Sequence, residues 1–354
     1  MTNTRFNDIF QIAGRAIGAG CKPLVIAEIS GNHGGSLEQG LSLIEACADA
    51  GAEMVKFQSY TPDTITLNSD APAFRVEAEL WKGQTLYNLY EKAHTPFEWH
   101  EALFAKCRAL GMIPISSPFD NSAVDMLENL DCAAYKVASC ELVDFGLIRR
   151  IAATGKPVIV SSGAANIAEL TEALDLLHEL GVKDVCLLHC ISAYPTGHKD
   201  ANLATITDYK ARFNLPVGFS DHTTGLAAPI AATALGACII EKHICHSVDD
   251  GSVDSAFSLE TADLKDLIQG IEQAYMSVGT PKSAPLDIEL ESLRFRRSLF
   301  VVKDIKAGET VAAKHIASVR PAGGLHTKHM ADIIGKTAKD NITTGTPTSW
   351  DLFE

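Results

Sequence analysis

Short apolar runs, rich in β-branched residues, recur along the chain between residues 24 and 244. Runs that are apolar on both faces are typical of strands in a parallel sheet that helices cover on either side. Polar or helix-like segments separate the runs, so the pattern predicts eight β/α units. The predicted strands are residues 24–30, 54–60, 112–119, 133–139, 157–163, 185–190, 215–221 and 238–244.

The segments between these runs have the period of amphipathic helices. Residues 36–51 begin with Ser36 and end with Gly51, and residues 166–181 begin with Asn166 and end with Gly181. Serine and asparagine cap the first turn of a helix, and glycine commonly ends one. Eight such units over roughly 250 residues are the size of a closed (β/α)8 TIM barrel. A doubly wound open sheet is the alternative that periodicity alone leaves open.

The pattern changes after a predicted helix at residues 262–279. We predict a barrel domain over residues 1–282, a turn-rich, charged linker over 283–294, and a small, mostly β domain over 295–354. Residues 61–97 form an unusually long connection with several aromatic side chains and lysines. Such a connection favours a structured insertion over a site.

Composition narrows the functional classes. A formal net charge of −14 argues against binding of nucleic acid, which needs a basic face. No apolar stretch has the length of a membrane helix, and residues 1–18 lack a secretory pattern, so we expect no membrane partner. The nine cysteines include no C-x-x-C pair and lie mostly in apolar runs, which indicates reduced thiols in a cytoplasmic protein.

Polar side chains gather at the ends of the predicted strands. Residues two apart on a strand share a face, so several of them form same-face pairs. In a barrel the carboxyl ends of the strands converge on the active site. A single residue of this kind is explained by an ordinary hydrogen bond, but the whole set is not. The set comprises Glu28, Ser30, Lys56, Gln58, Ser116, Ser117, Lys136, Ser139, Ser161, Ser162, His189, Ser220, His222, Glu241 and His243.

Lys56 and Lys136 lie inside apolar runs, where a lysine needs a compensating charge. One interpretation is a structural pairing with Glu28 or Glu241. We favour the alternative, in which the two lysines and nearby serine hydroxyls form a site for phosphate and carboxylate groups.

His222 and His243 end the seventh and eighth predicted strands, which are neighbours in a closed barrel. Two imidazoles brought together in this way are suited to a divalent metal, with other positions left to water and substrate. Two separate, hydrogen-bonded histidines are the alternative. His189 is a candidate supporting residue or substrate contact, and His246 is expected in a loop. His315, His326 and His329 are expected at the surface of the small domain.

Many segments resemble the sialic acid synthase family, whose members condense phosphoenolpyruvate with an open-chain amino sugar to form nonulosonic acids. These segments are IAEISGNHGGSLEQ, MVKFQSY, SSPFD, YKVASCE, GFSDHTTG, EKHI and SVRPAGGL. Within the family, LWKGQTLYNLYEKAHTPFEWHEALF, SSPFDNSAVDMLE, DSAFSLE and FRRSLFVVKDIKAGE are most similar to the synthases of pseudaminic acid. The resemblance implies a (β/α)8 barrel followed by a small antifreeze-like (SAF) domain. Ser192 departs from some relatives, which carry asparagine there.

The resemblance also implies roles for single residues. His222 and His243 would hold the metal, manganese as a rule, with magnesium or cobalt as alternatives. Glu28 is the candidate acid or base beside the reacting carbons. Arg320 would reach into the barrel site of the other subunit in a domain-swapped homodimer. Lys56, Lys136, Ser139, Ser161 and Ser220 would hold phosphoenolpyruvate, Glu141, Tyr194 and Asp254 would contact the amino sugar, and Gln58 is a further substrate-binding candidate.

The predicted function is therefore a transferase that joins phosphoenolpyruvate, a diacetamido-trideoxy hexose of altrose type and water, and releases phosphate by C–O cleavage. Synthesis of N-acetylneuraminate or legionaminate is the nearest alternative. A metal-dependent phosphosugar aldolase or isomerase would use the same kind of barrel without phosphoenolpyruvate. A non-catalytic sugar-binding protein is disfavoured, because it needs no lysines and histidines at converging strand ends.

Overall fold

The computed structural model of the chain describes residues 5–77 and 79–354. It has two compact units, Met1–Gly279 and Thr280–Glu354. Residues 1–4 of the predicted barrel domain and residue 78 of the predicted insertion lie outside the described residues. Within the described part, no helix is both long enough and apolar enough to cross a membrane.

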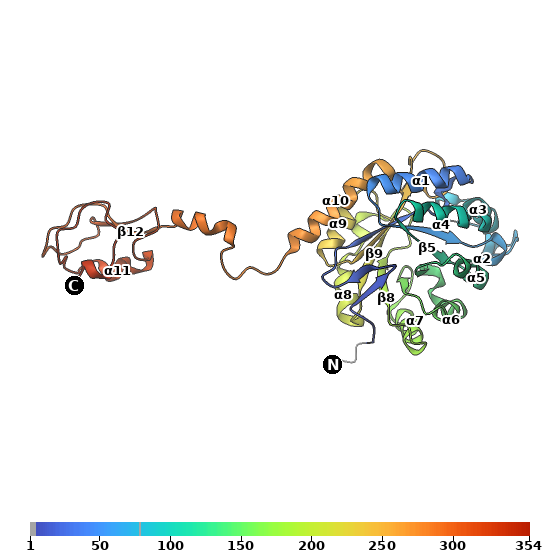
Figure 1. Cartoon of the computed structure of the whole chain (residues 1–354), viewed down its shortest axis with the longest axis horizontal. Coiled ribbons are helices and arrows are strands. Elements are labelled where there is room, and N and C mark those ends of the chain that lie inside the picture. Colours follow the sequence, from blue (N-terminus) through green and yellow to red (C-terminus); the bar gives the residue numbers. More distant parts are fainter. Residues whose placement is uncertain (1–4, 78) are drawn as a thin grey trace. The chain divides into compact units, whose positions relative to one another are not determined.

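Eight parallel strands form a closed barrel in the first unit, with helices around them (Figure 1). The last barrel strand pairs with both the seventh and the first, which closes the sheet. The predicted TIM barrel is thus confirmed, and closure excludes the doubly wound open sheet. The strands are β3 (Leu24–Glu28), β4 (Met54–Ser59), β5 (Ile113–Pro118), β6 (Tyr135–Val137), β7 (Val158–Ser161), β8 (Val185–Cys190), β9 (Val217–Asp221) and β10 (Ile239–Cys245), and β11 (Leu259–Glu260) extends the sheet beside β10.

The helices begin where the sequence places capping residues. The Ser36 side chain accepts a hydrogen bond from the backbone of Gln39, and Gly51 ends the same helix with φ 89°. Asn166 caps its helix together with Glu169 in a capping box. The main helices are α1 (Leu37–Ala50), α4 (His100–Ala109), α5 (Asn121–Asn129), α6 (Phe145–Ala152), α7 (Ile167–Glu179), α8 (Ala204–Phe213), α9 (Ala227–Ala234) and α10 (Thr261–Val278).

A hairpin of β1 (Ile9–Ile12) and β2 (Arg15–Gly18) covers the amino end of the barrel, a feature that the sequence analysis did not predict. Ile12 and Ile17 are buried in the barrel core. Arg15 Nε donates to Glu53 Oε2 at 2.7 Å, directly before β4 begins. The hairpin therefore closes the amino end of the barrel, and the barrel is open at the carboxyl ends of its strands.

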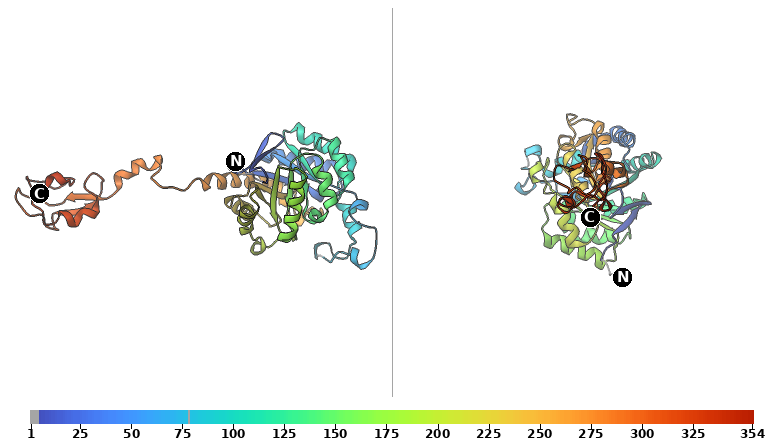
Figure 2. Two further views of the ribbon diagram at one scale, coloured as in Figure 1. Left: turned by 90° about the horizontal axis from the view of Figure 1, so that it is seen from below. Right: turned by 90° about the vertical axis from the view of Figure 1, so that its left-hand side faces the viewer.

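The insertion between β4 and α4 is structured, as predicted. It contains α2 (Pro62–Ile65), α3 (Leu86–Ala93) and three short 3-10 helices, η2 (Pro72–Phe74), η3 (Glu79–Trp81) and η4 (Phe97–Trp99). Figure 2 shows the described part of this insertion, in light blue and cyan, extending from the barrel. Isoleucine, leucine and aromatic side chains of this insertion line the cavity described below.

The second unit has its own small core around Leu299, Val301 and Ile333. It contains β12 (Ser298–Val301) and β13 (Ile316–Val319), which pair antiparallel, and α11 (Met330–Ile333). Two short 3-10 helices complete it, η9 (Thr327–His329) and η10 (Trp350–Leu352). The segment predicted as a linker is not irregular throughout, because Asp287–Phe295 forms the 3-10 helix η8.

The predicted surface position of His315 is wrong. Its side chain is buried, and Nδ1 accepts a hydrogen bond from the backbone of Ala312 at 3.1 Å. This local bond closes a turn between β12 and β13, a contact that spacing alone does not show.

One buried ion pair faces the helical layer of the barrel. Lys242 on β10 lies opposite Asp221 on β9, and Nζ is 2.6 Å from Oδ2. Nζ also donates to the Thr223 carbonyl at 2.6 Å. Both side chains are buried, so each compensates the charge of the other.

We expect Lys242→Met to lower the free energy of unfolding by about 3–5 kcal/mol, because it leaves Asp221 buried without its partner. Denaturant unfolding of the two proteins measures the difference. Lys183→Met, at an exposed position, is the matched control and should change stability by less than about 0.5 kcal/mol. Equal stability of Lys242→Met and the parent chain would contradict this account of the pair.

Candidate active site

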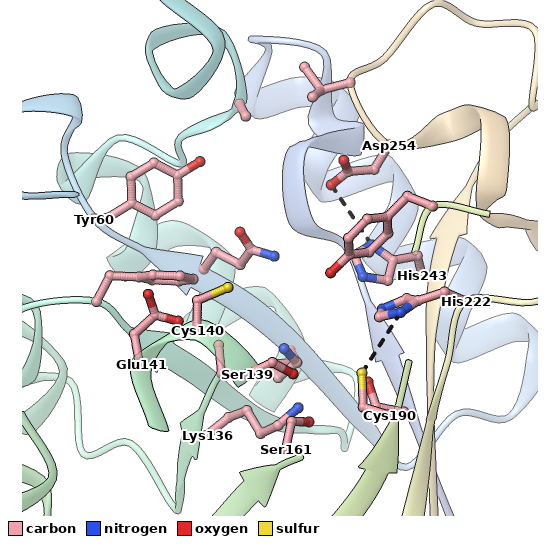
Figure 3. A pocket seen from close by; sticks show the side chains of 18 of the residues that line it. Tyr60, Lys136, Ser139, Cys140, Glu141, Ser161, Cys190, His222, His243 and Asp254 are labelled. Atoms are coloured by element: carbon pink, nitrogen blue, oxygen red, sulfur yellow. Dashed lines mark hydrogen bonds and ion pairs between the residues drawn. The ribbon is translucent and has the colours of Figure 1, made fainter. Parts of the chain in front are cut away.

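A cavity of about 460 Å³ opens at the carboxyl ends of the strands (Figure 3). This volume is within the range of small-molecule sites. The cavity brings together side chains from seven of the eight barrel strands or from the loops that follow them, as the convergence argument predicted, and β3 contributes none to its lining. Of the residues predicted in the barrel, Lys56, Gln58, Lys136, Ser139, Glu141, Ser161, Tyr194, Ser220, His222, His243 and Asp254 line it.

Two lysines and two glutamates make up its floor. Lys136 Nζ lies 2.6 and 2.8 Å from the two carboxylate oxygens of Glu241. Lys56 Nζ lies 3.0 Å from Glu28 and 3.6 Å from Glu241. All four side chains are buried, and Glu28 lies beneath the cavity rather than on its wall. The two interpretations of the lysines are therefore compatible, because structural pairing and a position in the cavity occur together.

Burial and ion pairing shift the pKa values of the two carboxyl groups in opposite directions. Burial opposes ionisation of Glu241, but Lys136 and Lys56 outweigh it and hold the pKa of Glu241 well below its usual range. Burial raises the pKa of Glu28, and the Lys56 ammonium only partly offsets this effect. Glu28 is consequently the carboxyl group of the floor that can carry a proton, as a general acid or base requires.

Serine hydroxyls and a backbone N–H face the cavity beside Lys136. Gly163 N donates to Ser139 Oγ at 3.1 Å. The hydroxyls of Ser161 and Ser192 are buried and have no hydrogen-bond partner among the described residues. A Cβ at Gly163 would lie 2.1 Å from Ser192 Oγ and 2.6 Å from Ser139 Oγ, so glycine keeps this corner open. Free hydroxyls next to an ammonium group suit a phosphate or carboxylate.

His222 and His243 lie side by side, with ring centroids 5.3 Å apart. His222 Nδ1 donates to the Ile191 carbonyl at 2.9 Å, so Nε2 is the ring nitrogen that can bind a metal. Burial lowers the pKa of His222, but the contacts with Cys190 and the Ile191 carbonyl outweigh burial and raise this pKa above its usual value. Burial and the neighbouring His222 hold the pKa of His243 well below its usual range, so its imidazole is neutral. Metal ions bind the neutral form of imidazole, so a metal would bind His243 as it stands and would compete with a proton at His222.

The donor set therefore fits a divalent metal whose remaining positions are filled by water and substrate. Within residues 5–77 and 79–354, no group of three or more His, Cys, Asp or Glu side chains is placed to hold a metal ion. Catalytic zinc sites usually have three protein ligands, so a metal held by this pair would depend on water and substrate for the rest of its coordination.

A chain of polar contacts connects His243 to the floor. Asp254 Oδ2 is 3.8 Å from His243 Nδ1 and accepts a short hydrogen bond from Ser30. Gln58 Nε2 donates to both Ser30 Oγ at 3.0 Å and Glu28 Oε1 at 3.1 Å. This chain of contacts orients Glu28 relative to the histidine pair.

The prediction that His189 supports the site is wrong. Its Nε2 is 2.7 Å from the Ala201 carbonyl, and its ring stacks on Phe219 outside the barrel. Its neighbour Cys190 lines the cavity instead, with Sγ 3.9 Å from His222 Nδ1. Strict two-residue alternation along β8 would have indicated Cys190 rather than His189. Tyr60, Phe119 and Phe257 also line the cavity, from loops after strands, although the sequence pattern did not single them out. Arg320 is exposed on the second unit, and its predicted reach into a partner's site stays a prediction.

Comparison with known proteins agrees with this geometry. Residues 43–283 match the NeuB family, and residues 296–354 match the SAF domain. The chain belongs to the NeuB family. It is accordingly an enzyme, a transferase of the synthase type, and its small second unit is a SAF domain.

The relatives of this NeuB family member include named synthases over nearly the full length. A pseudaminic acid synthase from Helicobacter pylori is 41% identical over 94% of this chain and 98% of its own. One from Campylobacter jejuni is 42% identical over 92% of this chain and 94% of its own. An N,N'-diacetyllegionaminic acid synthase from C. jejuni is 33% identical over 90% of this chain and 97% of its own. The crystal structure of an N-acetylneuraminic acid synthetase from Leptospira borgpetersenii, solved with citrate, has a TM-score of 0.73 and 29% identity, and covers 80% of this chain and 95% of that one.

We expect Glu141→Gln to stabilise the protein at pH 8 and to have little effect at pH 5. Burial raises the pKa of Glu141 to about 7, whereas an unfolded glutamate titrates near 4.5. The folded chain therefore keeps the proton that the unfolded chain releases between these values, and stability falls as the pH rises through this window. Thermal unfolding at both pH values measures the effect.

Glu172→Gln, at an exposed position on α7, is the matched control for that series. An equal shift in melting temperature for Glu141→Gln at pH 5 and pH 8 would show that Glu141 is not held protonated.

Proposed function

We propose that this enzyme is a pseudaminic acid synthase. It condenses phosphoenolpyruvate with an open-chain 2,4-diacetamido-2,4,6-trideoxy hexose of altrose type and water, and releases the nonulosonic acid and phosphate. The observation that carries the choice of sugar is the identity of 41–42% to named pseudaminic acid synthases, against 33% to a diacetyllegionaminic acid synthase, over comparable lengths. Synthesis of legionaminate or N-acetylneuraminate is the second candidate, favoured only by the weaker likenesses.

The floor and its serine corner suit phosphoenolpyruvate. The molecule carries a phosphate and a carboxylate, and the cavity offers Lys56, Lys136 and the free hydroxyl of Ser161. Both lysines are already held in place by Glu241, so binding needs little reorganisation. Ser139 and Ser220 complete the anion site in this proposal.

The histidine pair marks the place of the sugar aldehyde. His222 and His243 would hold a divalent metal, for which manganese is our first choice and magnesium or cobalt the alternatives. When bound, such an ion supplies Lewis-acid activation of the aldehyde oxygen. Tyr194 packs against His222 with ring centroids 4.5 Å apart, and Asp254 lies beside His243, so these side chains enclose the same end of the sugar.

The chemistry follows from these positions. C3 of phosphoenolpyruvate attacks the aldehyde carbon, and positive charge develops at C2. Water adds at C2, and the resulting hemiketal phosphate loses phosphate through C–O cleavage. The lysines stabilise the negative charge of the departing phosphate. Glu28, buried with a raised pKa, takes a proton from the water or gives one to the new hydroxyl.

The homodimer is part of the proposal. The segment before the SAF domain exposes apolar side chains, among them Ile288 at 87% and Phe295 at 51%. Exposed apolar surface of this kind supports contact with a second chain. In that dimer Arg320 would reach the barrel site of the partner subunit.

Incubation with phosphoenolpyruvate and a panel of free amino sugars tests the proposal. We expect phosphate release and a product of nonulosonic acid mass with the altrose-type diacetamido sugar, and loss of both when a chelator is present. Turnover with N-acetylmannosamine in preference to that sugar would favour the second candidate. Consumption of a phosphosugar without phosphoenolpyruvate would indicate the aldolase or isomerase class instead.

We expect His222→Ala to reduce turnover by at least about 1,000-fold, because a Lewis-acid site contributes several kcal/mol to the transition state. His198→Ala, an exposed histidine outside the cavity, is the matched control. Thermal unfolding checks that both variants remain folded. Turnover by folded His222→Ala at the parent rate would exclude His222 as a metal ligand.

A further inference from the structure

One tyrosine of the cavity carries a hydroxyl group that the fold itself does not use. Tyr60 follows β4, and two-residue alternation places it on the same face as Lys56 and Gln58, which also line the cavity. Its side chain is buried, with 2% of the residue exposed. Its hydroxyl nevertheless has no hydrogen-bond partner among the described residues. A buried hydroxyl without a partner is costly, so a ligand that accepts a hydrogen bond from it gains affinity.

The ring of Tyr60 is held in place by other aromatic side chains. It packs edge-on against Phe119, with centroids 5.1 Å apart, and against Tyr90, with centroids 5.7 Å apart. The ring of His94 lies 6.5 Å away. These contacts fix the ring without using the hydroxyl. The direction of the hydroxyl is therefore set before a substrate binds, which lowers the entropy cost of a contact with it.

The Tyr60 hydroxyl points into the cavity from the side across from His222, His243 and Asp254 (Figure 3). Burial raises the pKa of Tyr60 well above its usual value, and Asp254 adds to this shift. The hydroxyl is thus a neutral group that can donate one hydrogen bond.

The position of this donor favours a neutral acceptor. Lys136 and Ser161 lie together in another part of the cavity, and an ammonium group binds a phosphate or carboxylate more strongly than a phenol does (Figure 3). A sugar hydroxyl or an acetamido carbonyl is the kind of oxygen that a neutral, preset O–H donor suits.

We infer that Tyr60 is a substrate-binding residue whose hydroxyl donates a hydrogen bond to a neutral oxygen of the amino sugar, across the cavity from the histidine pair. The inference rests on the proposed function, because it takes from it that an amino sugar occupies this part of the cavity. The bound sugar displaces water from the cavity. Loss of the hydroxyl would therefore leave one oxygen of the sugar without a partner.

The test compares the parent enzyme with Tyr60→Phe, which removes the hydroxyl and keeps the ring. We expect kcat/KM for the amino sugar to fall about 5- to 100-fold, the cost of one unpaired acceptor. The KM for phosphoenolpyruvate should change by less than about twofold, because this contact is made to the sugar alone. The melting temperature should not fall, because the hydroxyl has no partner in the fold. Tyr87→Phe, in the same insertion but outside the cavity, is the matched control and should turn over as the parent does.

The choice of sugar keeps this test separate from the proposed function. The amino sugar is whichever member of the panel the parent enzyme turns over, so a sugar other than the altrose type would overturn the proposed function and still allow the comparison. Calorimetric binding of the corresponding alditol, which lacks the aldehyde, measures the contact without turnover. Weaker alditol binding by Tyr60→Phe, with unchanged binding of phosphoenolpyruvate, supports the inference.

Analogues in which one acetamido group at a time is replaced by a hydroxyl identify the acceptor. A Tyr60→Phe penalty that disappears with one analogue assigns the bond to that acetamido carbonyl, and a penalty that persists with each assigns it to a hydroxyl. Equal kcat/KM for the sugar in Tyr60→Phe and the parent enzyme, or equal losses toward the sugar and phosphoenolpyruvate, overturns the inference and leaves the proposed function standing.

Discussion

The site depends on the pairing of two buried lysines with two buried glutamates. A lysine enclosed in a barrel is costly unless an opposite charge compensates it. Here Glu241 contacts both Lys56 and Lys136, and Glu28 contacts Lys56 alone. These contacts hold two ammonium groups at the bottom of a cavity in a protein whose formal net charge is −14. Without this pairing, an anionic substrate would meet an unfavourable field and no fixed positive charge.

The same pairing also separates the two carboxyl groups in function. Glu241 interacts with two ammonium groups and Ser220, and it stays ionised. Glu28 shares one lysine and is held by Gln58, so burial dominates and raises its pKa. One carboxylate thus positions the lysines, and the other can exchange a proton. The insertion and the histidine pair surround the space above this floor.

Much of this arrangement could be predicted from the sequence because barrel strands obey simple rules. Residues two apart share a face, so Lys56 with Gln58 and Glu241 with His243 could be assigned to the cavity side by counting. The same rule gives Lys242 to the outer face, where it pairs with Asp221. Because the carboxyl ends of barrel strands converge, these residues could be predicted to lie close together without any knowledge of distances.

Other features depend on contacts that counting does not reveal. His189 was selected for its chemistry, although its position in the alternation places it outside the barrel, stacked on Phe219. Leu89 lines the cavity because of the way the insertion folds back, which the apolar pattern alone does not specify. The amino-terminal hairpin has strands of four residues each, too short for a clear periodic signal.

The most direct test of the central claim is calorimetric titration of phosphoenolpyruvate into the parent enzyme and Lys136→Met. If the paired lysines form the anion site, Lys136→Met should weaken binding by about 100-fold, the size of a lost charge-assisted contact. Lys265→Met, at an exposed position on α10, should bind as the parent does. Equal affinity of the parent enzyme and folded Lys136→Met for phosphoenolpyruvate would contradict the account.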